Sequence, residues 1–181
     1  MVRKIEIVPY DPDWLKIFEI EAKNIREVLG FHLVAIHHIG STAIFSMLAK
    51  PTIDMLLVVM SLAKLDGLNN RMQELGYEPK GENGIPGRRY YRKLEGEIHR
   101  FHLHAFEVGH PEIKRHLNFR DFLREHADEA RAYQELKLRL SAEFPFDSKK
   151  YTSGKTAFIR MIDQRAGNWR LDSDKDMENY E

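Results

Sequence analysis

The sequence predicts an α+β protein in which a mixed β-sheet with flanking helices is followed by a helical segment packed on the sheet. Apolar, β-branched runs typical of strands occur only within residues 1–108, and the pattern over 110–168 is helical. A chain of 181 residues has room for one sizeable core, and no linker composition separates the two halves. We therefore expect a single domain over 1–168.

The strands are predicted from short apolar runs bounded by turn residues. One of them, Ile53–Met60, is nearly all apolar, as in a strand buried on both faces. The last two form a predicted hairpin around Glu95 and Gly96. The full set of predicted strands is Ile5–Val8, His32–Ile39, Ile53–Met60, Tyr77–Lys80, Arg88–Leu94 and Ile98–Glu107.

The helices are predicted from apolar residues spaced three and four apart and from end signals. The first begins at Asp11 and Pro12, an N-cap followed by proline, and ends at Gly30. The acidic end of the chain, 171–181, has little apolar content and is expected to be disordered. The other predicted helices are Leu62–Leu75, Pro111–His126, Asp128–Phe144 and Ser148–Arg165, the last capped by Asp147.

The composition excludes several functional classes. The absence of cysteine removes disulfides, thiolate nucleophiles and iron–sulfur clusters, so a metal would need His, Asp or Glu ligands. The longest apolar run, Met55–Met60, is far shorter than the roughly 18 residues of a membrane-spanning helix, and no signal peptide is recognisable. We expect a cytoplasmic protein. The net charge of +0 argues against a nucleic acid partner, although 84–120 is locally basic.

A glycine-serine pair and an acid on the following strand form the most informative segment. Gly40 and Ser41 end a predicted strand, where exposed backbone N–H groups can hold phosphate oxygens. The pair is also an ordinary turn sequence. Asp54 is a lone acid on an apolar strand, and burying its carboxylate requires a cation, a metal or several hydrogen-bond donors. It is a site candidate, with capping of a backbone group as the alternative.

Four segments carry a resemblance to a known family: Val8–Trp14, His38–Ala43 with Ala49–Asp54, His102–Glu107 leading to Arg115–Asp121, and the closing Tyr151, Lys155, Phe158 and Ile159. Over nearly the whole chain, to about Ile162, the sequence resembles the GrpB family, a group of divergent nucleotidyltransferase-fold proteins. The resemblance implies a nucleotidyltransferase-like sheet. In some bacteria a related domain is fused to dephospho-coenzyme A kinase, which implies a nucleotide or a nucleotide-containing coenzyme as ligand.

The resemblance also assigns roles to residues. In the nucleotidyltransferase superfamily a Gly-Ser pair holds the triphosphate, and two acids one residue apart on the next strand bind magnesium. This implies nucleotide binding by Gly40, Ser41 and Thr42, and metal binding by Asp54. Alternate strand residues share a face, so the second acid would stand two positions after Asp54. That position holds Leu56, which places nucleotidyl transfer in question.

Two histidines offer a replacement for the missing acid. His102 and His104 alternate on a predicted strand and therefore share one face. Together with Asp54 they would form a two-histidine, one-carboxylate set suited to zinc, manganese or iron. For the cofactor as a whole we expect a divalent metal, magnesium or manganese in preference to zinc. The other interpretation is that one histidine faces solvent or donates to a backbone carbonyl. Asp54 and His104 are the candidate catalytic residues.

A basic hairpin supplies further candidates for nucleotide binding. Arg88, Tyr90 and Arg92 share one strand face, where arginine can bind phosphate and tyrosine can contact a base. A charged, solvated sheet edge is the equally weighted alternative. Lys50 can reach phosphates beside Ser41. The segment around Lys155 lacks the glycine spacing of a phosphate-binding P-loop, and we do not interpret it as one.

Two functional hypotheses follow. The first is a nucleotidyltransferase-fold protein that binds a nucleotide or coenzyme-like small molecule with a divalent metal and transfers a nucleotidyl group. The second is a non-catalytic protein that binds a nucleotide or a partner through the same pocket, and Leu56 favours it. Nucleic acid binding through the basic hairpin is a weaker third hypothesis, and the oligomeric state is left open.

Overall fold

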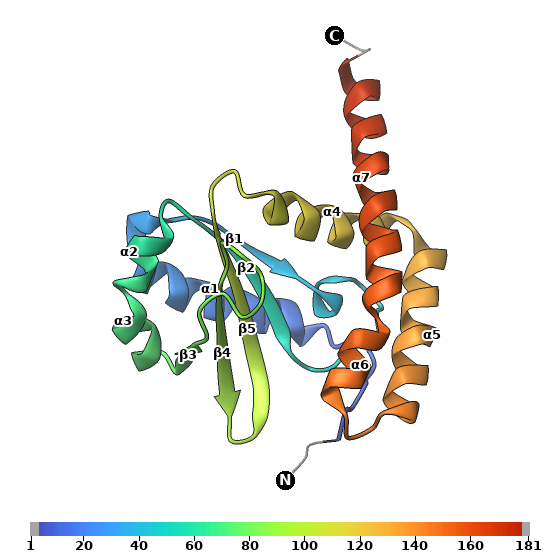
Figure 1. Ribbon diagram of the computed structural model, residues 1–181, viewed down its shortest axis with the longest axis horizontal. Helices are drawn as coiled ribbons and strands as arrows, with labels where there is room; N and C mark the ends of the chain where they lie inside the picture. The colour runs from blue at the N-terminus through green and yellow to red at the C-terminus, as the bar shows by residue number, and fades with distance from the viewer. Residues whose placement is uncertain (1–3, 179–181) are drawn as a thin grey trace.

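The computed structural model describes residues 4–178, with side chains described to Leu171, and it confirms the predicted fold class. One mixed five-stranded sheet carries helices on both faces and is followed by a helical segment (Figure 1). The strands are β1 (Leu33–Ile39), β2 (Ile53–Val59), β3 (Tyr77–Pro79), β4 (Arg89–Glu95) and β5 (Ile98–Glu107). The α-helices are α1 (Asp13–Leu29), α2 (Leu62–Asp66), α3 (Asn69–Glu74), α4 (Pro111–Glu125), α5 (Ala127–Glu143), α6 (Ser148–Gly154) and α7 (Thr156–Glu178).

The strand order is β1-β2-β5-β4-β3, with β2 and β5 parallel and the other neighbours antiparallel. The register pairs Asp54 of β2 with His102 of β5, and His104 of β5 with Tyr90 of β4. Directly opposite residues in a sheet project from the same face. The register therefore gathers the predicted site residues of three strands on one side of the sheet.

The strand β2 is buried on both faces, as its apolar sequence predicts. Met55 and Leu57 point into the larger core, which α1, α2 and α3 cover. Leu56 belongs to a separate apolar cluster with Ile39 and Phe106, and α4 packs against that cluster. Each fully buried side chain of this size contributes about 1.5–3 kcal/mol, so β2 is fixed between two layers.

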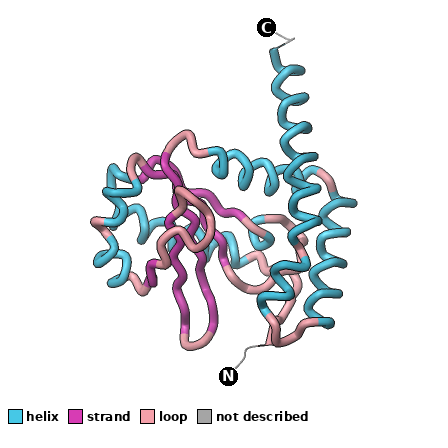
Figure 2. The backbone as a smooth tube through the Cα atoms, in the orientation of Figure 1, coloured by secondary structure: helices cyan, strands magenta, loops and turns pink. Residues whose placement is uncertain are grey.

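The segment between β1 and β2 connects the sheet to the helical half. Ile44 and Met47 of this segment are almost fully buried among residues of α4, α5 and α7, including Phe122, Tyr133 and Ile162. The helices α4 to α7 lie together beside the strand layer (Figure 2). The link between two strands thus forms part of the core of the helices.

Two predicted helices are each divided in two. The predicted helix Leu62–Leu75 breaks at Gly67, where glycine and the preceding aspartate have low helix propensity. The predicted helix Ser148–Arg165 breaks after Gly154, where a Cβ atom would lie 2.6 Å from Leu140 of α5. The absence of a side chain at Gly154 therefore permits close contact between α5 and α6.

The two ends of the described chain also differ from the prediction. The segment Ile5–Val8 is not a regular strand: Val8 forms a single bridge with Ala49, while the Ile5 N–H donates to the carbonyl of Pro145. The predicted disordered end, 171–181, is helical to Glu178, because α7 extends beyond the other helices (Figure 1). Extending an existing helix costs far less than starting one. Residues 179–181 lie outside the described residues.

A close approach of two strands requires glycine at the end of β1. Gly40 has φ of 70° and ψ of −171°, a conformation that side chains disfavour. A Cβ atom at this position would lie 2.6 Å from Oδ2 of Asp54. The glycine therefore allows the turn before Ser41 to contact the Asp54 carboxylate.

We predict that Gly40→Ala destabilises the protein more than Gly96→Ala does. Both glycines have positive φ, but Gly96, in the β4–β5 turn, has open space at its Cβ position. Both variants carry the backbone cost of about 1–2 kcal/mol, and only Gly40→Ala adds an overpacking cost of about 1–3 kcal/mol. Urea denaturation would measure both free energies of unfolding. Equal losses in the two variants would contradict the contact with Asp54.

Candidate functional site

A cavity of about 410 Å³ lies where the ends of β1 and β2 meet β5, α5 and α6. Three hollows of about 640, 550 and 460 Å³ are larger, but this cavity contains the cluster of charged side chains described below. Its lining residues are Gly40, Ser41, Thr42, Ala49, Lys50, Thr52, Asp54, Asn83, Arg88, Tyr90, His102, His104, Phe119, Tyr133, Lys137, Tyr151, Thr152 and Lys155.

The structure brings together every candidate site residue of the sequence analysis except Arg92. Arg92 forms an ion pair with Glu78 of the neighbouring strand β3 and does not line the cavity. The residues at the wall of the cavity are Gly40, Ser41, Thr42, Lys50, Asp54, Arg88, His102 and His104. Their convergence from β1, β2, β5 and the segments between them follows from the strand register.

Asp54 is the sole acid among the described residues that line this cavity. Its Oδ1 atom lies 3.2 Å from Nδ1 of His102 and 3.9 Å from Nε2 of His104. Burial raises the pKa of Asp54, but the hydrogen bonds and electrostatic attraction of His102 and His104 lower it by more, so its pKa lies well below the usual range. Asp54 is therefore an ionised carboxylate.

Both ring nitrogens of His102 have partners. Nδ1 faces Asp54 at 3.2 Å, and Nε2 lies 2.9 Å from Nδ1 of His99. Nδ1 of His104 lies 3.3 Å from the guanidinium of Arg88, which can only donate. The His104 proton is therefore on Nε2, the nitrogen nearer Asp54, and burial lowers the pKa of His104. Each histidine is already engaged by protein groups.

The predicted metal-ligand set is not assembled as it would be around an ion. In the described part of the chain, no group of three or more His, Asp or Glu side chains is arranged to hold a metal. The position of the missing second acid, Leu56, is fully buried against Ile39, Phe106 and Leu117. An acid there would be buried in an apolar cluster. Of the expected ligands, Asp54 is the one with the oxygen atoms that magnesium prefers.

Three lysines surround the Ser41 side of the cavity. The ammonium of Lys137, only 2% exposed, donates to Oγ of Ser41 at 3.0 Å and to the carbonyl of Leu48. Burial, helped by the charge of Lys155, lowers the pKa of Lys137 to about 7. Burial and the charge of Lys50 lower the pKa of Lys155 to about 8, against the opposing charge of Asp54. The surroundings of the cavity therefore disfavour the charged forms of Lys137 and Lys155.

Sequence reasoning missed Lys137 and undervalued Lys155. Lys137 lies on the same helix face as Tyr133 and Leu140, at spacings of four and three, and these are the buried residues of α5. A lysine within an apolar helical stripe is therefore the signal that could have identified it. Lys155 enters the cavity because the helix breaks after Gly154, which the continuous helix of the prediction concealed.

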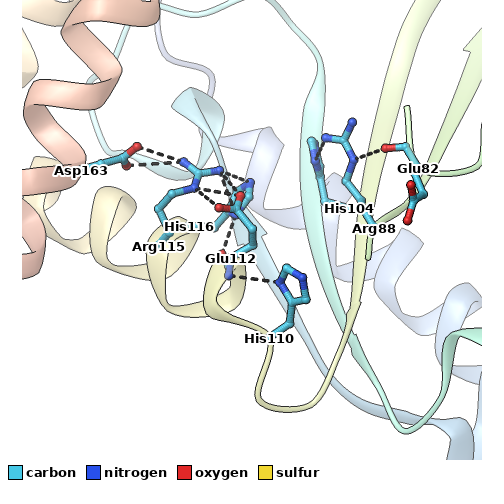
Figure 3. Close-up of polar contacts among 8 residues, drawn as sticks. All are labelled: Glu82, Arg88, His104, His110, Glu112, Arg115, His116 and Asp163. Atoms are coloured by element: carbon cyan, nitrogen blue, oxygen red, sulfur yellow. Dashed lines mark hydrogen bonds and ion pairs between the residues drawn. The ribbon is translucent and has the colours of Figure 1, made fainter. Parts of the chain in front are cut away.

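Arg88 fixes the loop that precedes β4. Its guanidinium donates to the carbonyl of Glu82 at 3.1 Å and contacts His104 (Figure 3). It also donates to the carbonyl of Asn83 at 2.6 Å. Most of the N–H donors of Arg88 therefore contact groups of the protein itself. This weakens the prediction that Arg88 binds the phosphate of a ligand. It holds the loop and His104 in place at the cavity wall.

A charged network supports the cavity from α4. Arg115 binds Glu112 within α4 and also Asp163 of α7, and the three side chains lie together (Figure 3). The ring of His116 lies 5.4 Å from that of His104. Burial lowers the pKa of His116 to about 4, so the ring is neutral. The network joins α4 and α7 behind the histidines of the site.

Comparison with known proteins identifies the family. The model of the family described as GrpB protein matches residues 4–165. The UPF0157 protein YqkA of Bacillus subtilis is 44% identical over 93% of this chain, which spans about half (49%) of that relative. The crystal structure of GrpB from Enterococcus faecalis is 36% identical, with a TM-score of 0.88, over 92% of this chain and 99% of that one.

The nucleotidyltransferase-like fold has a more distant counterpart. Terminal uridylyl transferase 4 from Trypanosoma brucei, solved with bound dUTP, is 12% identical, with a TM-score of 0.50, over 85% of this chain and 53% of that one. At this identity the similarity concerns the fold alone. The match of the family model over most of the chain, together with the close relatives, shows that the chain belongs to the GrpB family.

Proposed function

We propose that the cavity binds the phosphate groups of a nucleotide or of a nucleotide-containing coenzyme. One observation carries the proposal: Lys50, Lys137 and Lys155 converge on a cavity that contains one carboxylate, Asp54, among its described lining residues. Arg88 adds a fourth positive charge at the wall. The cavity therefore has an excess of positive charge in a partly desolvated space, and an anionic group would neutralise it.

The turn at Gly40 and Ser41 adds a polar wall to this cavity. Ser41 accepts a hydrogen bond from Lys137 and is the first residue of a short 3₁₀ segment, Ser41–Ala43. Charged lysines provide most of the attraction to phosphate oxygens, because hydrogen bonds between ionised groups are about twice as strong as neutral ones. The Thr42 hydroxyl instead contacts His38 and the carbonyl of Thr52, so its hydrogen bonds stabilise the fold.

In this proposal a divalent metal ion is held by Asp54 together with phosphate oxygens of the ligand. Magnesium and manganese suit these oxygen donors, and zinc would need the histidines released from their present partners. A bound metal would neutralise charge on the phosphates. His102 would keep the Asp54 carboxylate oriented through its contact at 3.2 Å.

Binding without nucleotidyl transfer is the form of this function that the geometry favours. The position of the second acid holds Leu56, which is fully buried in an apolar cluster. His102 and His104 do not replace that acid, because ring nitrogens of both already contact other protein groups. Nucleotidyl transfer, with Asp54 and His104 as catalytic residues, is the second candidate. Turnover of a nucleoside triphosphate by the purified protein would favour that candidate. A location in the cytoplasm stays a prediction, and no described helix is long and apolar enough to cross a membrane.

We predict that phosphate binding is coupled to proton uptake. A bound anion raises the pKa of Lys137 and Lys155 above their present values of about 7 and 8. Affinity is therefore highest below these pKa values and falls as the pH rises through the higher values of the bound state. Calorimetry with tripolyphosphate at pH 8, in two buffers of different ionisation enthalpy, would measure the protons taken up.

Variants of two lysines test the source of these protons. Lys155→Gln should reduce the uptake and lower the affinity about tenfold or more, as expected for one charge-assisted hydrogen bond. Lys149→Gln, on the exposed side of α6, should change neither. Proton release on binding, or equal effects of the two variants, would contradict the role of the buried lysines.

We predict that Asp54→Asn removes the effect of metal on nucleotide binding and preserves the fold. The amide cannot neutralise a divalent ion, so Mg²⁺ or Mn²⁺ should no longer increase the thermal shift produced by a nucleotide. In EDTA the variant should bind the nucleotide at least as tightly as the unaltered protein, because a negative charge beside the phosphates is lost. A metal dependence that survives in the variant would exclude Asp54 as the metal ligand.

A further inference from the structure

We infer that the hollow of about 550 Å³ beside the cavity holds the base of a mononucleotide whose phosphates occupy the cavity. The inference rests on the proposed function. The hollow, which we call the side groove, shares Lys50, Thr52, Tyr90 and His102 with the cavity. Since four residues line both spaces, a single ligand can extend from one into the other.

The walls of the side groove carry exposed apolar side chains. Leu94, near the end of β4, is 38% exposed, and Phe146, in the turn between α5 and α6, is 57% exposed. Both lie at the groove, one from the sheet and one from the helical half. Exposed apolar surface beside a charged cavity favours a ligand with a flat apolar face, and aromatic stacking suits every base.

The charges of the side groove differ from those of the cavity. Glu6 and Glu97 line the groove, and their carboxylates can accept hydrogen bonds from the amino groups of a base. Lys4 adds a donor. These acidic groups disfavour a second phosphate in the side groove. The ligand that matches this distribution carries phosphate at one end and an uncharged ring at the other, which describes a mononucleotide and excludes an oligonucleotide.

The hollow of about 640 Å³ is separated from the cavity. Among the described residues it shares Thr42 alone with the cavity lining. The Thr42 hydroxyl is buried and lies 2.9 Å from Nε2 of His38, and it donates to the carbonyl of Thr52. The one side chain common to both linings is therefore already hydrogen-bonded within the protein. Phe45, 78% exposed at this other hollow, is therefore a matched control for Phe146.

Calorimetry of four nucleoside triphosphates and of tripolyphosphate tests the inference. At least one of ATP, CTP, GTP and UTP should bind about tenfold or more tightly than tripolyphosphate, as expected when a base stacks on an aromatic ring. Phe146→Ala should weaken the binding of that nucleotide about fivefold or more and leave tripolyphosphate unchanged. Phe45→Ala should change neither affinity. Because Phe146 is more than half exposed, its truncation should preserve the thermal midpoint.

Leu94→Ala on the opposite wall provides a second variant, expected to weaken nucleotide binding and not tripolyphosphate binding. The inference is overturned if tripolyphosphate binds but no nucleotide binds more tightly, or if Phe45→Ala and Phe146→Ala have equal effects. A dinucleotide that binds more tightly than every nucleoside triphosphate would overturn the mononucleotide class. If neither tripolyphosphate nor any nucleotide binds, the proposed function itself fails, so the two failures are distinguishable.

Discussion

The buried ammonium of Lys137 is the contact on which the arrangement of the site depends. It extends from α5 into the segment between β1 and β2, where it donates to Ser41 and to the carbonyl of Leu48. A buried charge is tolerated only when several acceptors compensate its desolvation. The same segment buries Ile44 among the helices, so the ionic contact and the apolar packing act on one short stretch of chain. Together they fix the sheet against the helical half.

This junction explains why the cavity lies where it does. Because the β1–β2 segment packs on the helices, Ser41 and Lys50 lie at the same cavity wall as residues of α5 and α6. Gly154 lets α6 approach α5, and the helix break that follows places Lys155 at the same wall. The packing therefore concentrates positive charge opposite Asp54. Positive charges gathered in a partly desolvated space are electrostatically unfavourable, which is the physical basis for proposing an anionic ligand.

The fold could be predicted from the sequence more fully than the site could. The apolar run of β2 and the register of alternating residues in β5 predict the sheet and the common face of His102 and His104. Asp54 was identifiable as a lone acid on an apolar strand. The partners of His102 and His104 could not be predicted, because they depend on tertiary contacts. His99 contacts a ring nitrogen of His102, and Arg88 contacts a ring nitrogen of His104. Lys137 was missed although a lysine within an apolar helical stripe is a signal in the sequence, and Lys155 was undervalued because the helix break after Gly154 was not predicted.

The replacement of an acid by Leu56 changes how the remaining charges should be interpreted. With two carboxylates, a site can hold metal ions before a nucleotide arrives. With Asp54 alone, opposed by four cationic side chains at the cavity wall, the proposed binding would begin with the phosphates, and a metal would arrive with them. Leu56 also stabilises the cluster that packs β2 on α4. Leu56 thus stands where the resemblance implies a second acid, and its side chain stabilises the scaffold around the proposed pocket.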